Sequence, residues 1–261
     1  MKHVFKAGAY TLEYTESRAD TPVIWENHCH TEFEMIAVLE GDISVLLEGR
    51  HYRLTENQTV IIPPLFYHTV TANKKGVYRR VTALFDPGAI PSVLQPHFLK
   101  KDAYLTPFYS SQGGELKRIC QTGDPVFYEP LSQSLMTQIL YEDARAERSD
   151  AAVETDSFLH EIISYIDAHL CEKILLDDLA AHTSRSKSAV CHLFTEKMSI
   201  SPKQYILQKK LALAHKRITE GTPPTLAAMQ VGYENYSSFY RMYQKLLKTA
   251  PSAGGKRKDT H

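Results

Sequence analysis

The chain has 261 residues, which is enough for one large domain or two ordinary ones with a core in each. Hydrophobic residues make up 43% and charged residues 23%, as in a soluble globular protein. No apolar run approaches the roughly 20 residues that cross a bilayer, and the N-terminus lacks the apolar stretch of a secretory signal. The cysteines have no CxxC spacing and are expected to be reduced. Composition therefore excludes a membrane-spanning protein and predicts a cytoplasmic one.

The net charge of zero hides two halves of opposite sign. Residues 1–156 contain 15 Lys and Arg against 21 Asp and Glu, a net charge of −6, whereas residues 157–261 contain 15 against 9, a net charge of +6. A basic half joined to an acidic half indicates that the basic half faces a polyanion such as nucleic acid. Chance distribution of surface charge gives the same asymmetry, so this feature needs support from motifs.

The first third of the chain has the pattern of short strands. Its apolar runs are interrupted by turn residues at Gly41-Asp42, Glu48-Gly49 and Pro63-Pro64. We expect strands over residues 34–39, 43–47, 51–54, 59–62 and 77–85. Strands this short, with turns this close together, predict an antiparallel sandwich or barrel.

The middle of the chain changes from strand to helix. Residues 87–130 are rich in Pro, Gly and aromatic side chains and are expected to form short irregular elements. A helix is predicted over residues 132–147, and its apolar side chains share one face: Leu135, Ile139, Leu140 and Ala144. Residues 147–156 are polar and contain the expected linker, and helices are predicted from Ser157 onward.

An internal repeat of 49 residues is the strongest signal in the basic half. The paired positions are Val190 and Phe239, Leu193 and Met242, Phe194 and Tyr243, Met198 and Leu247, and Ser201-Pro202 and Ala250-Pro251. Because the apolar members recur at i, i+3, i+4 and i+8, each copy is expected to contain a long helix with a buried stripe. Each long helix should end near Pro202 or Pro251.

A shorter helix is expected upstream of each long one. Residues 176–181 open with aspartates, which suit a helix N-terminus, and residues 226–229 lead to Gly232, which can adopt positive φ in a tight turn. Short helix, tight turn and longer helix together make a helix-turn-helix. Residues 202–218 predict a connecting helix with four inward side chains: Tyr205, Leu211, Ala214 and Ile218.

The exposed face of each long helix is the surface that DNA would meet. The candidate contacts in the first copy are Ser186, Lys187, Ser188, Cys191, His192 and Thr195. Those in the second copy are Asn235, Tyr236, Ser237, Tyr240, Arg241, Gln244 and Lys245. Arg241 can bond guanine bidentately and Gln244 can bond adenine. The lysines expected to take phosphates are Lys187, Lys197, Lys203, Lys209, Lys210 and Lys245.

Residues ~157–252 resemble the AraC/XylS family of bacterial regulators. The matching positions are Ile166 to Leu170, Leu179-Ala180, Ser186-x3-Val190-x2-Leu193-Phe194, Ser201-Pro202-x2-Tyr205, Lys210-x3-Ala214, Gly232-Tyr233-x-Asn235, Phe239-x-Arg241-x-Tyr243 and Pro251. The resemblance implies two recognition helices in successive major-groove segments of double-stranded DNA, about 34 Å apart. It also implies a small-molecule effector, with a sugar or related metabolite as the class by association.

Some positions depart from the family pattern. His192 stands where the family usually has Arg, so the first recognition helix is expected to contact DNA weakly or through water. Ala228-Met229 reverses the usual order of a large residue and then Ala, which predicts unusual packing of the second unit. Further departures are Lys210, Lys248 and the sequence Gly254-Gly255-Lys256-Arg257.

A second resemblance lies in residues ~20–85. His28-Cys29-His30-x3-Glu34-x6-Gly41 follows the first cupin motif, and Pro63-x4-His68 resembles the second, although Asn57, Leu65 and Ala72 depart from it. His28 and His30 point to the same side if the segment is extended. Imidazoles and a carboxylate can bind a divalent metal such as Zn, Fe(II), Mn or Ni.

The same box has a second interpretation as part of an organic effector pocket without metal. The candidate pocket residues are Trp25, His28, His30, Glu34, Tyr52 and His68. Aromatic side chains that can line such a pocket, or simply belong to the core, are Trp25, Phe33, Tyr52, Tyr67 and Tyr78. A purely structural barrel is the third interpretation.

The predicted fold is α+β with two domains: an N-terminal cupin-like antiparallel β-barrel (jelly roll) and a C-terminal all-α domain with two helix-turn-helix units. The predicted boundaries are residues 1–130 for the effector-binding barrel, 131–156 for a helix and linker, and 157–261 for the DNA-binding domain. The helix at 132–147 resembles the dimerising helix of the family, which implies a homodimer, and the alternative is a helix packed on its own barrel. RNA polymerase is a further candidate partner.

The predicted function is a ligand-responsive, sequence-specific DNA-binding transcription regulator, with no enzyme activity. One rival is a metal-dependent cupin enzyme with an appended helical domain, which draws on His28, His30, Glu34 and His68 alone. The other is a helical protein-interaction module that does not bind DNA. No general acid, base or nucleophile stands out beyond the box, which argues against the enzyme.

Overall fold

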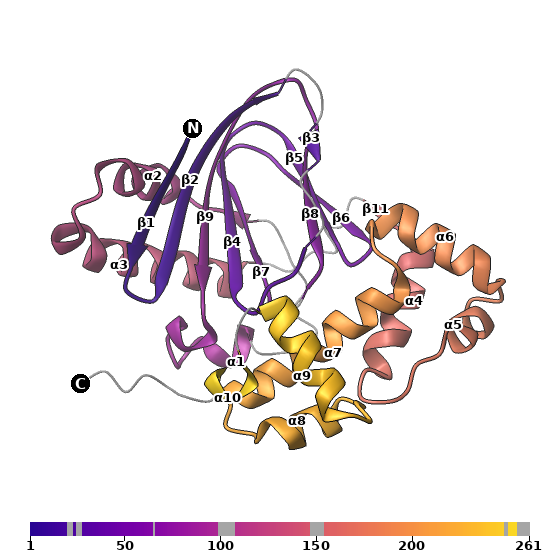
Figure 1. Cartoon of the computed structure of the whole chain (residues 1–261). Helices are drawn as coiled ribbons and strands as arrows, with labels where there is room; N and C mark the ends of the chain where they lie inside the picture. The colour runs from indigo at the N-terminus through magenta and orange to yellow at the C-terminus, as the bar shows by residue number, and fades with distance from the viewer. Residues whose placement is uncertain are drawn as a thin grey trace. The chain divides into compact units, whose positions relative to one another are not determined.

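The computed structural model describes residues 1–19, 23–24, 28–64, 66–98, 108–146, 154–247 and 250–254. The chain divides into two compact units, Met1–Thr155 and Asp156–His261 (Figure 1). Among the helices described, none is both long and apolar enough to span a bilayer. The predicted combination of an antiparallel sheet domain followed by a helical domain is confirmed.

The first unit contains two antiparallel sheets. One sheet has the strand order β1 (Lys2–Ala7), β2 (Tyr10–Ala19), β9 (Gly76–Phe85), β4 (Phe33–Glu40), β7 (Gln58–Ile62) and β10 (Phe108–Tyr109). The other has the order β11 (Glu154–Thr155), β6 (Arg50–Leu54), β5 (Ile43–Leu47), β8 (His68–Ala72) and β3 (Val23–Ile24). The five strands predicted from the sequence are present as β4, β5, β6, β7 and β9, and the other six described strands had no predicted range.

The alternation of side chains along β4 separates two cores. Ile36 and Val38 join a buried cluster contributed by both sheets, whose other members include Val45, Val60 and Val70. Met35 and Ala37 point the opposite way, into a cluster shared with helices. Because successive residues of a strand face opposite sides, Glu34 lies on the same side of β4 as Ile36 and Val38.

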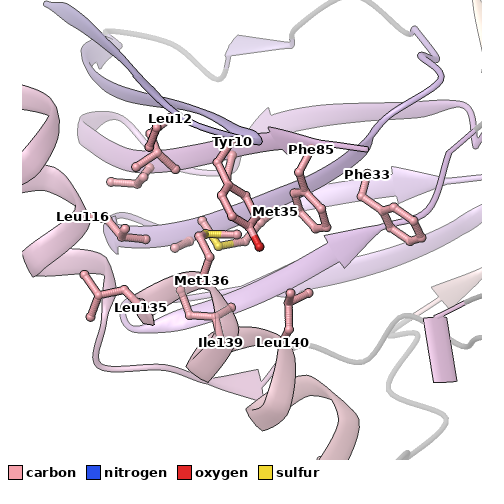
Figure 2. Close-up of a cluster of buried hydrophobic side chains, with 14 of the residues drawn as sticks. Tyr10, Leu12, Phe33, Met35, Phe85, Leu116, Leu135, Met136, Ile139 and Leu140 are labelled. Carbon is pink, nitrogen blue, oxygen red and sulfur yellow. The ribbon is translucent and has the colours of Figure 1, made fainter. Parts of the chain in front are cut away.

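Two helices cover the outer face of the first sheet. Figure 2 shows Leu135, Met136, Ile139 and Leu140 of α3 (Pro125–Arg145) turned toward side chains of the sheet, among them Met35. Leu116 of α2 (Gly113–Thr122) joins the same cluster. The predicted apolar face of the α3 segment therefore packs on its own barrel in the described structure.

The expectation of short irregular elements over residues 87–130 holds for a 3-10 turn (Pro87–Ala89), α1 (Gln95–Phe98) and β10, and residues 99–107 lie outside the described residues. It was wrong for residues 113–130, which form α2 and the start of α3. The helix α3 continues through Pro130, even though an interior proline removes a backbone hydrogen bond. Burial of the apolar face against the sheet offsets that cost, and such burial is decided by tertiary contacts.

The second unit is all-helical, as predicted. Its elements are α4 (Ser157–Ala168), α5 (Leu176–His182), α6 (Lys187–Met198), α7 (Pro202–Thr219), α8 (Pro224–Gln230), α9 (Tyr236–Leu247) and α10 (Pro251–Gly254). The connecting helix α7 begins with Ser201 and Gln204 capping each other's backbone N–H groups, at 3.3 and 3.2 Å. Its predicted inward residues are all buried: Tyr205, Leu211, Ala214 and Ile218.

The predicted 49-residue repeat is present in the packing. Val190, Phe194 and Met198 of α6 are buried, and their counterparts Phe239 and Tyr243 of α9 are fully buried. Residues of α7, α8 and α9 share one core, which includes Leu211, Ala227 and Val231. Phe194 of α6 packs on Tyr205 of α7, with ring centroids 5.4 Å apart, so both helix-turn-helix units contact the long helix α7.

The turns of the two helix-turn-helix units share a left-handed residue, which is a serine in the first and a glycine in the second. Ser184 in the first turn has φ of 52°, and Gly232 in the second has φ of 78°, both in the left-handed region. The packing problem expected from Ala228-Met229 does not arise, because Ala228 is buried while Met229 is 70% exposed. Lys248 and residues 255–257 lie outside the described residues.

Candidate functional site

The helix α6 presents the first predicted DNA face. Lys187, Ser188, His192 and Thr195 are exposed and Cys191 is half-buried. Ser186 is the N-cap of α6, where its Oγ accepts a hydrogen bond from the N–H of Ala189 at 3.2 Å. The predicted face is thus accessible within its unit, and Ser186 also starts the helix.

The helix α9 presents the corresponding face in the second unit. The exposed candidates are Tyr236, Ser237, Arg241, Gln244 and Lys245, and Tyr240 is half-buried. Asn235 accepts hydrogen bonds from the N–H groups of Ser237 and Ser238, at 2.8 and 3.3 Å, so it fixes the start of α9. Gln244 donates to the Tyr240 hydroxyl at 3.1 Å.

Several lysines predicted to take phosphates are engaged within the protein instead. Lys209 is 5% exposed and lies 3.1 Å from a carboxylate oxygen of Asp167. Lys210 is 6% exposed and donates to the carbonyl oxygen of Glu172 at 2.5 Å. Lys197 pairs with Asp156. The phosphate prediction is wrong for Lys209 and Lys210, because a buried ammonium that bonds the protein cannot reach DNA.

Lys210 instead lies between the turn that precedes α9 and the segment that follows α4. A Cβ added at Gly232 would lie 2.9 Å from the Lys210 Nζ and 3.1 Å from the carbonyl oxygen of Cys171. The turn therefore fits against the residues that follow α4 so closely that a side chain would collide with them. This contact joins the turn of the second helix-turn-helix unit to the segment between α4 and α5.

In the first unit of the chain, the structure brings the predicted box residues together. One potential ligand atom from each of His28, His30, Glu34 and His68 lies within 4.8 Å of the other three. His28 and His68 exchange backbone hydrogen bonds of 3.1 and 3.0 Å, and Glu34 approaches from β4 in the opposite sheet. The predicted arrangement of His28 and His30 on one side is confirmed.

One carboxylate oxygen is the focus of this cluster. The Glu34 Oε2 lies 3.1 Å from His30 Nε2 and 2.8 Å from His68 Nε2. Burial by itself raises the pKa of Glu34, but the hydrogen bonds and charges of His30 and His68 outweigh it and hold the pKa well below its usual range. Burial lowers the pKa of His30, and the contact with Glu34 more than reverses this, so its pKa is raised.

The aromatic candidates are mostly core. Tyr52 and Tyr78 are each 3% exposed and belong to the cluster between the sheets. Phe33 stacks on Phe85 on the opposite face of the sheet, with ring centroids 5.4 Å apart. Tyr67 is also buried. Trp25 lies outside the described residues.

The comparisons with known proteins match both units. The AraC-like ligand binding domain family matches residues 10–161, which is more than half of the chain. This chain belongs to the AraC family of transcriptional regulators. A helix-turn-helix domain family matches residues 179–257 of this AraC-family regulator, a range that begins within α5 and holds α6 through α10. It is a DNA-binding regulator with a ligand-binding domain, and no finding supports the cupin enzyme.

Relatives extend over most of the regulator. The uncharacterized HTH-type transcriptional regulator YdiP of Escherichia coli (strain K12) is 26% identical over 252 residues, covering 87% of this chain and 80% of YdiP. YobQ of Bacillus subtilis (strain 168), also an uncharacterized HTH-type transcriptional regulator, is 24% identical over 238 residues, covering 87% of this chain and 88% of YobQ. A crystal structure of unsaturated fatty acid bound ToxT from Vibrio cholerae has 11% identity, 94% coverage of each chain and a TM-score of 0.43.

Two features of the sites were missed by reasoning from the sequence. The capping role of Ser186 and Asn235 was one, although these residues stand 49 positions apart and both have the side-chain type of an N-cap. The other was the link between Gly232, Lys210 and the end of α4, which has no local sequence signal.

Proposed function

We propose that this regulator binds specific duplex DNA through the exposed faces of α6 and α9, and that α9 contributes more of the base recognition. The observation that carries the proposal is the exposure of Arg241 and Gln244 on a helix whose opposite side, Phe239 and Tyr243, is fully buried. A guanidinium and an amide at i and i+3 can each bond a base edge in the major groove.

The exposed face of α6 offers weaker contacts to DNA than that of α9. Its central residue, His192, has a side chain 78% exposed and lies 3.8 Å from the carboxylate of Glu196, which brings negative charge to this surface. Lys187 lies 2.6 Å from Asp177 and must leave that carboxylate to reach a phosphate. We infer that α6 mainly positions the protein on the DNA backbone, while α9 reads bases.

The test uses duplexes enriched from a randomised pool by the purified full chain. Arg241→Ala is expected to weaken binding to the enriched duplex by about 10- to 100-fold, because a bidentate base contact contributes roughly 1–3 kcal/mol. His192→Ala, a matched change on the first face, is expected to weaken it less than about threefold. Failure of the wild-type chain to enrich any sequence, or equal affinity of Arg241→Ala and wild type, contradicts the proposal.

We further propose a division of labour along the chain. Residues 1–130 form the effector-binding barrel, residues 131–156 a helix and linker, and residues 157–261 the DNA-binding domain. The effector site is assigned to the polar cluster of His28, His30, Glu34 and His68, with Tyr52 and Trp25 as further candidates. Supporting this choice, the cluster brings four ionisable side chains to the edge of an otherwise apolar core between the sheets. A small ligand shifts such a regulator only if it binds one DNA-binding state better than the other.

We propose that this regulator works in the cytoplasm, that it has no catalytic activity and that RNA polymerase is a further partner.

We also propose a homodimer that uses the outer surface of α3. Val126, Phe127 and Tyr141 of this helix are 79%, 75% and 52% exposed, although its other face is packed on the sheet. Sedimentation of the full chain tests this, with Phe127→Glu expected to shift the dimer toward the monomer.

A further inference from the structure

The helix α9 has a line of aromatic and polar side chains at i, i+4 and i+8 on its exposed side: Tyr236, Tyr240 and Gln244. Residues four positions apart lie one above the other on a helix, so their side chains can meet. The Nε2 of Gln244 donates a hydrogen bond to the Tyr240 hydroxyl at 3.1 Å. Because Gln244 is one of the two side chains proposed to read bases, this contact joins a base-reading group to a neighbour.

Aromatic contacts hold Tyr240 against the helix. Its side chain is half-buried, and its ring centroid lies 6.3 Å from that of Tyr236. The Tyr236 ring in turn lies 5.7 Å from that of Phe239, which is fully buried. A long glutamine side chain loses much rotamer freedom when it is fixed. A hydrogen bond to a hydroxyl that is itself held restricts Gln244 before DNA binds, so less freedom remains to be lost on binding.

The same hydrogen bond decides which groups of the Gln244 amide remain for a base. A glutamine amide has two N–H groups that donate and one oxygen that accepts. With one N–H given to Tyr240, the second N–H and Oε1 are left. One donor beside one acceptor matches adenine in the major groove, where N6 donates and N7 accepts. Guanine offers acceptors at both N7 and O6, so a bidentate contact with guanine needs both N–H groups of the amide.

We propose that Tyr240 is a positioning residue that makes Gln244 select adenine at one base pair of the DNA site. Tyr240 acts through the amide of Gln244 and needs no contact of its own with the selected base. The inference deepens the proposed function, because it rests on α9 as the base-reading helix and names a base that this helix selects. The contribution of Arg241 is separate, since a guanidinium can bond guanine bidentately without a positioning hydroxyl.

The test uses the duplex that the wild-type full chain enriches from a randomised pool, and duplexes in which each base pair is replaced in turn by the other three. Gln244→Ala identifies the base pair, because it is expected to lower the preference for adenine at a single position by at least about 5-fold. Tyr240→Phe keeps the ring and removes the hydroxyl, and it is expected to lower the preference at the same position by about 3- to 10-fold. Preferences at other positions should change by less than about twofold.

A double variant and a control separate positioning from a direct role. The chain with both Tyr240→Phe and Gln244→Ala is expected to lose no more preference at this base pair than Gln244→Ala alone, because the hydroxyl acts only through the amide. Tyr165→Phe on α4 is the matched control, since it removes the hydroxyl of another half-buried tyrosine of the helical unit, and it should leave the base preferences unchanged. Far-ultraviolet circular dichroism confirms that each variant is folded.

Three results would overturn the proposal. If Tyr240→Phe weakens binding to all duplexes equally, the hydroxyl contacts the DNA backbone and does not position Gln244. If Tyr240→Phe keeps the wild-type preference, Gln244 leaves the hydroxyl when it binds DNA. If Gln244→Ala removes a preference for a base other than adenine, the amide does not select as proposed. The enrichment by wild type and the affinity of Arg241→Ala test the proposed function independently, so the two failures can be told apart.

Discussion

The two helix-turn-helix units solve the same folding problem with different residues. Their recognition helices have the same length of 12 residues and begin at capping residues 49 positions apart, Ser186 and Asn235. Their buried stripes match, with Phe194 facing inward in one and Tyr243 in the other. The shared parts are those that make a helix and bury one side of it.

The differences lie in how each unit is anchored and in what it exposes. The first unit is tied to α4 by the pair between Lys197 and Asp156. The second has a tyrosine hydroxyl, Tyr243, at 2.5 Å from His215 Nδ1, where the first has Phe194. The exposed faces differ as well, His192 against Arg241. The two units therefore share their framework, and they differ in their anchors and in the exposed residues of α6 and α9.

The largest effect on stability is expected at the second turn. Gly232→Ala should destabilise the chain by about 1–3 kcal/mol, because it forces a left-handed residue and a contact with the Cys171 carbonyl. Gly221→Ala is the matched control, since Gly221 has φ of 99° but nothing within 4 Å of the added Cβ. Urea unfolding followed by circular dichroism measures both. Equal losses would mean that the close packing of the second turn is unimportant.

The N-cap residues of α6 and α9 should contribute equally to the stability of the chain. Ser186→Ala and Asn235→Ala are each expected to cost about 1 kcal/mol of stability, since each leaves a helix N–H group without its partner. Ser188→Ala, on the exposed face of α6, serves as the control and should change stability by less than about 0.5 kcal/mol. Thermal unfolding separates this role from DNA contact. If only one of the two substitutions lowers stability, the two caps are not equivalent.

The anchor of the first unit should depend on pH. Burial raises the pKa of Asp156, but hydrogen bonds from Lys197 and from the N–H of Leu159 outweigh it, so the folded-state pKa is below the usual value. A lowered carboxyl pKa contributes stability above the unfolded value of about 3.9, and that contribution is lost as the pH falls through the folded pKa. The free energy of unfolding of wild type should therefore exceed that of Asp156→Asn by about 1 kcal/mol at pH 7, and by less below about pH 4.

Urea midpoints at a series of pH values measure this difference. Glu161→Gln, an exposed carboxylate of the same helix, is the control. In the sequence of the second unit, Leu246 stands 49 residues beyond Lys197, and a leucine side chain cannot form such an ion pair. A difference between wild type and Asp156→Asn that stays constant from pH 7 to pH 3 would show that the carboxylate charge is not what anchors α6.

The smallest effect is expected at the first turn. Ser184 adopts φ of 52° where the second unit has glycine. Ser184→Gly should stabilise the chain by about 0.5 kcal/mol, because relief of left-handed strain slightly exceeds the added entropy of the unfolded chain. Differential scanning calorimetry can detect such a shift. A decrease in stability would indicate that the serine side chain supports the turn.

Periodic features were predictable from the sequence, and features that depend on distant partners were not. The strand β4, the helix α7 and the repeat all have a regular apolar pattern that local rules can identify. The strand β2 also alternates, through Tyr10, Leu12 and Tyr14, yet its polar appearance concealed it. The start of α3 was missed because Pro130 argues locally against a helix.

The sequence by itself determined the order of the domains, the duplicated helical units and the cluster of His28, His30, Glu34 and His68. Each of these has a characteristic spacing of residue types along the chain. Tertiary structure alone decided that Lys209 and Lys210 are buried, that Met229 is exposed and that Gly232 fits against the end of α4. It also brought Glu34 of one sheet to His68 of the other. These outcomes depend on which surfaces meet in space, and burial and charge pairing between distant segments have no signature in local spacing.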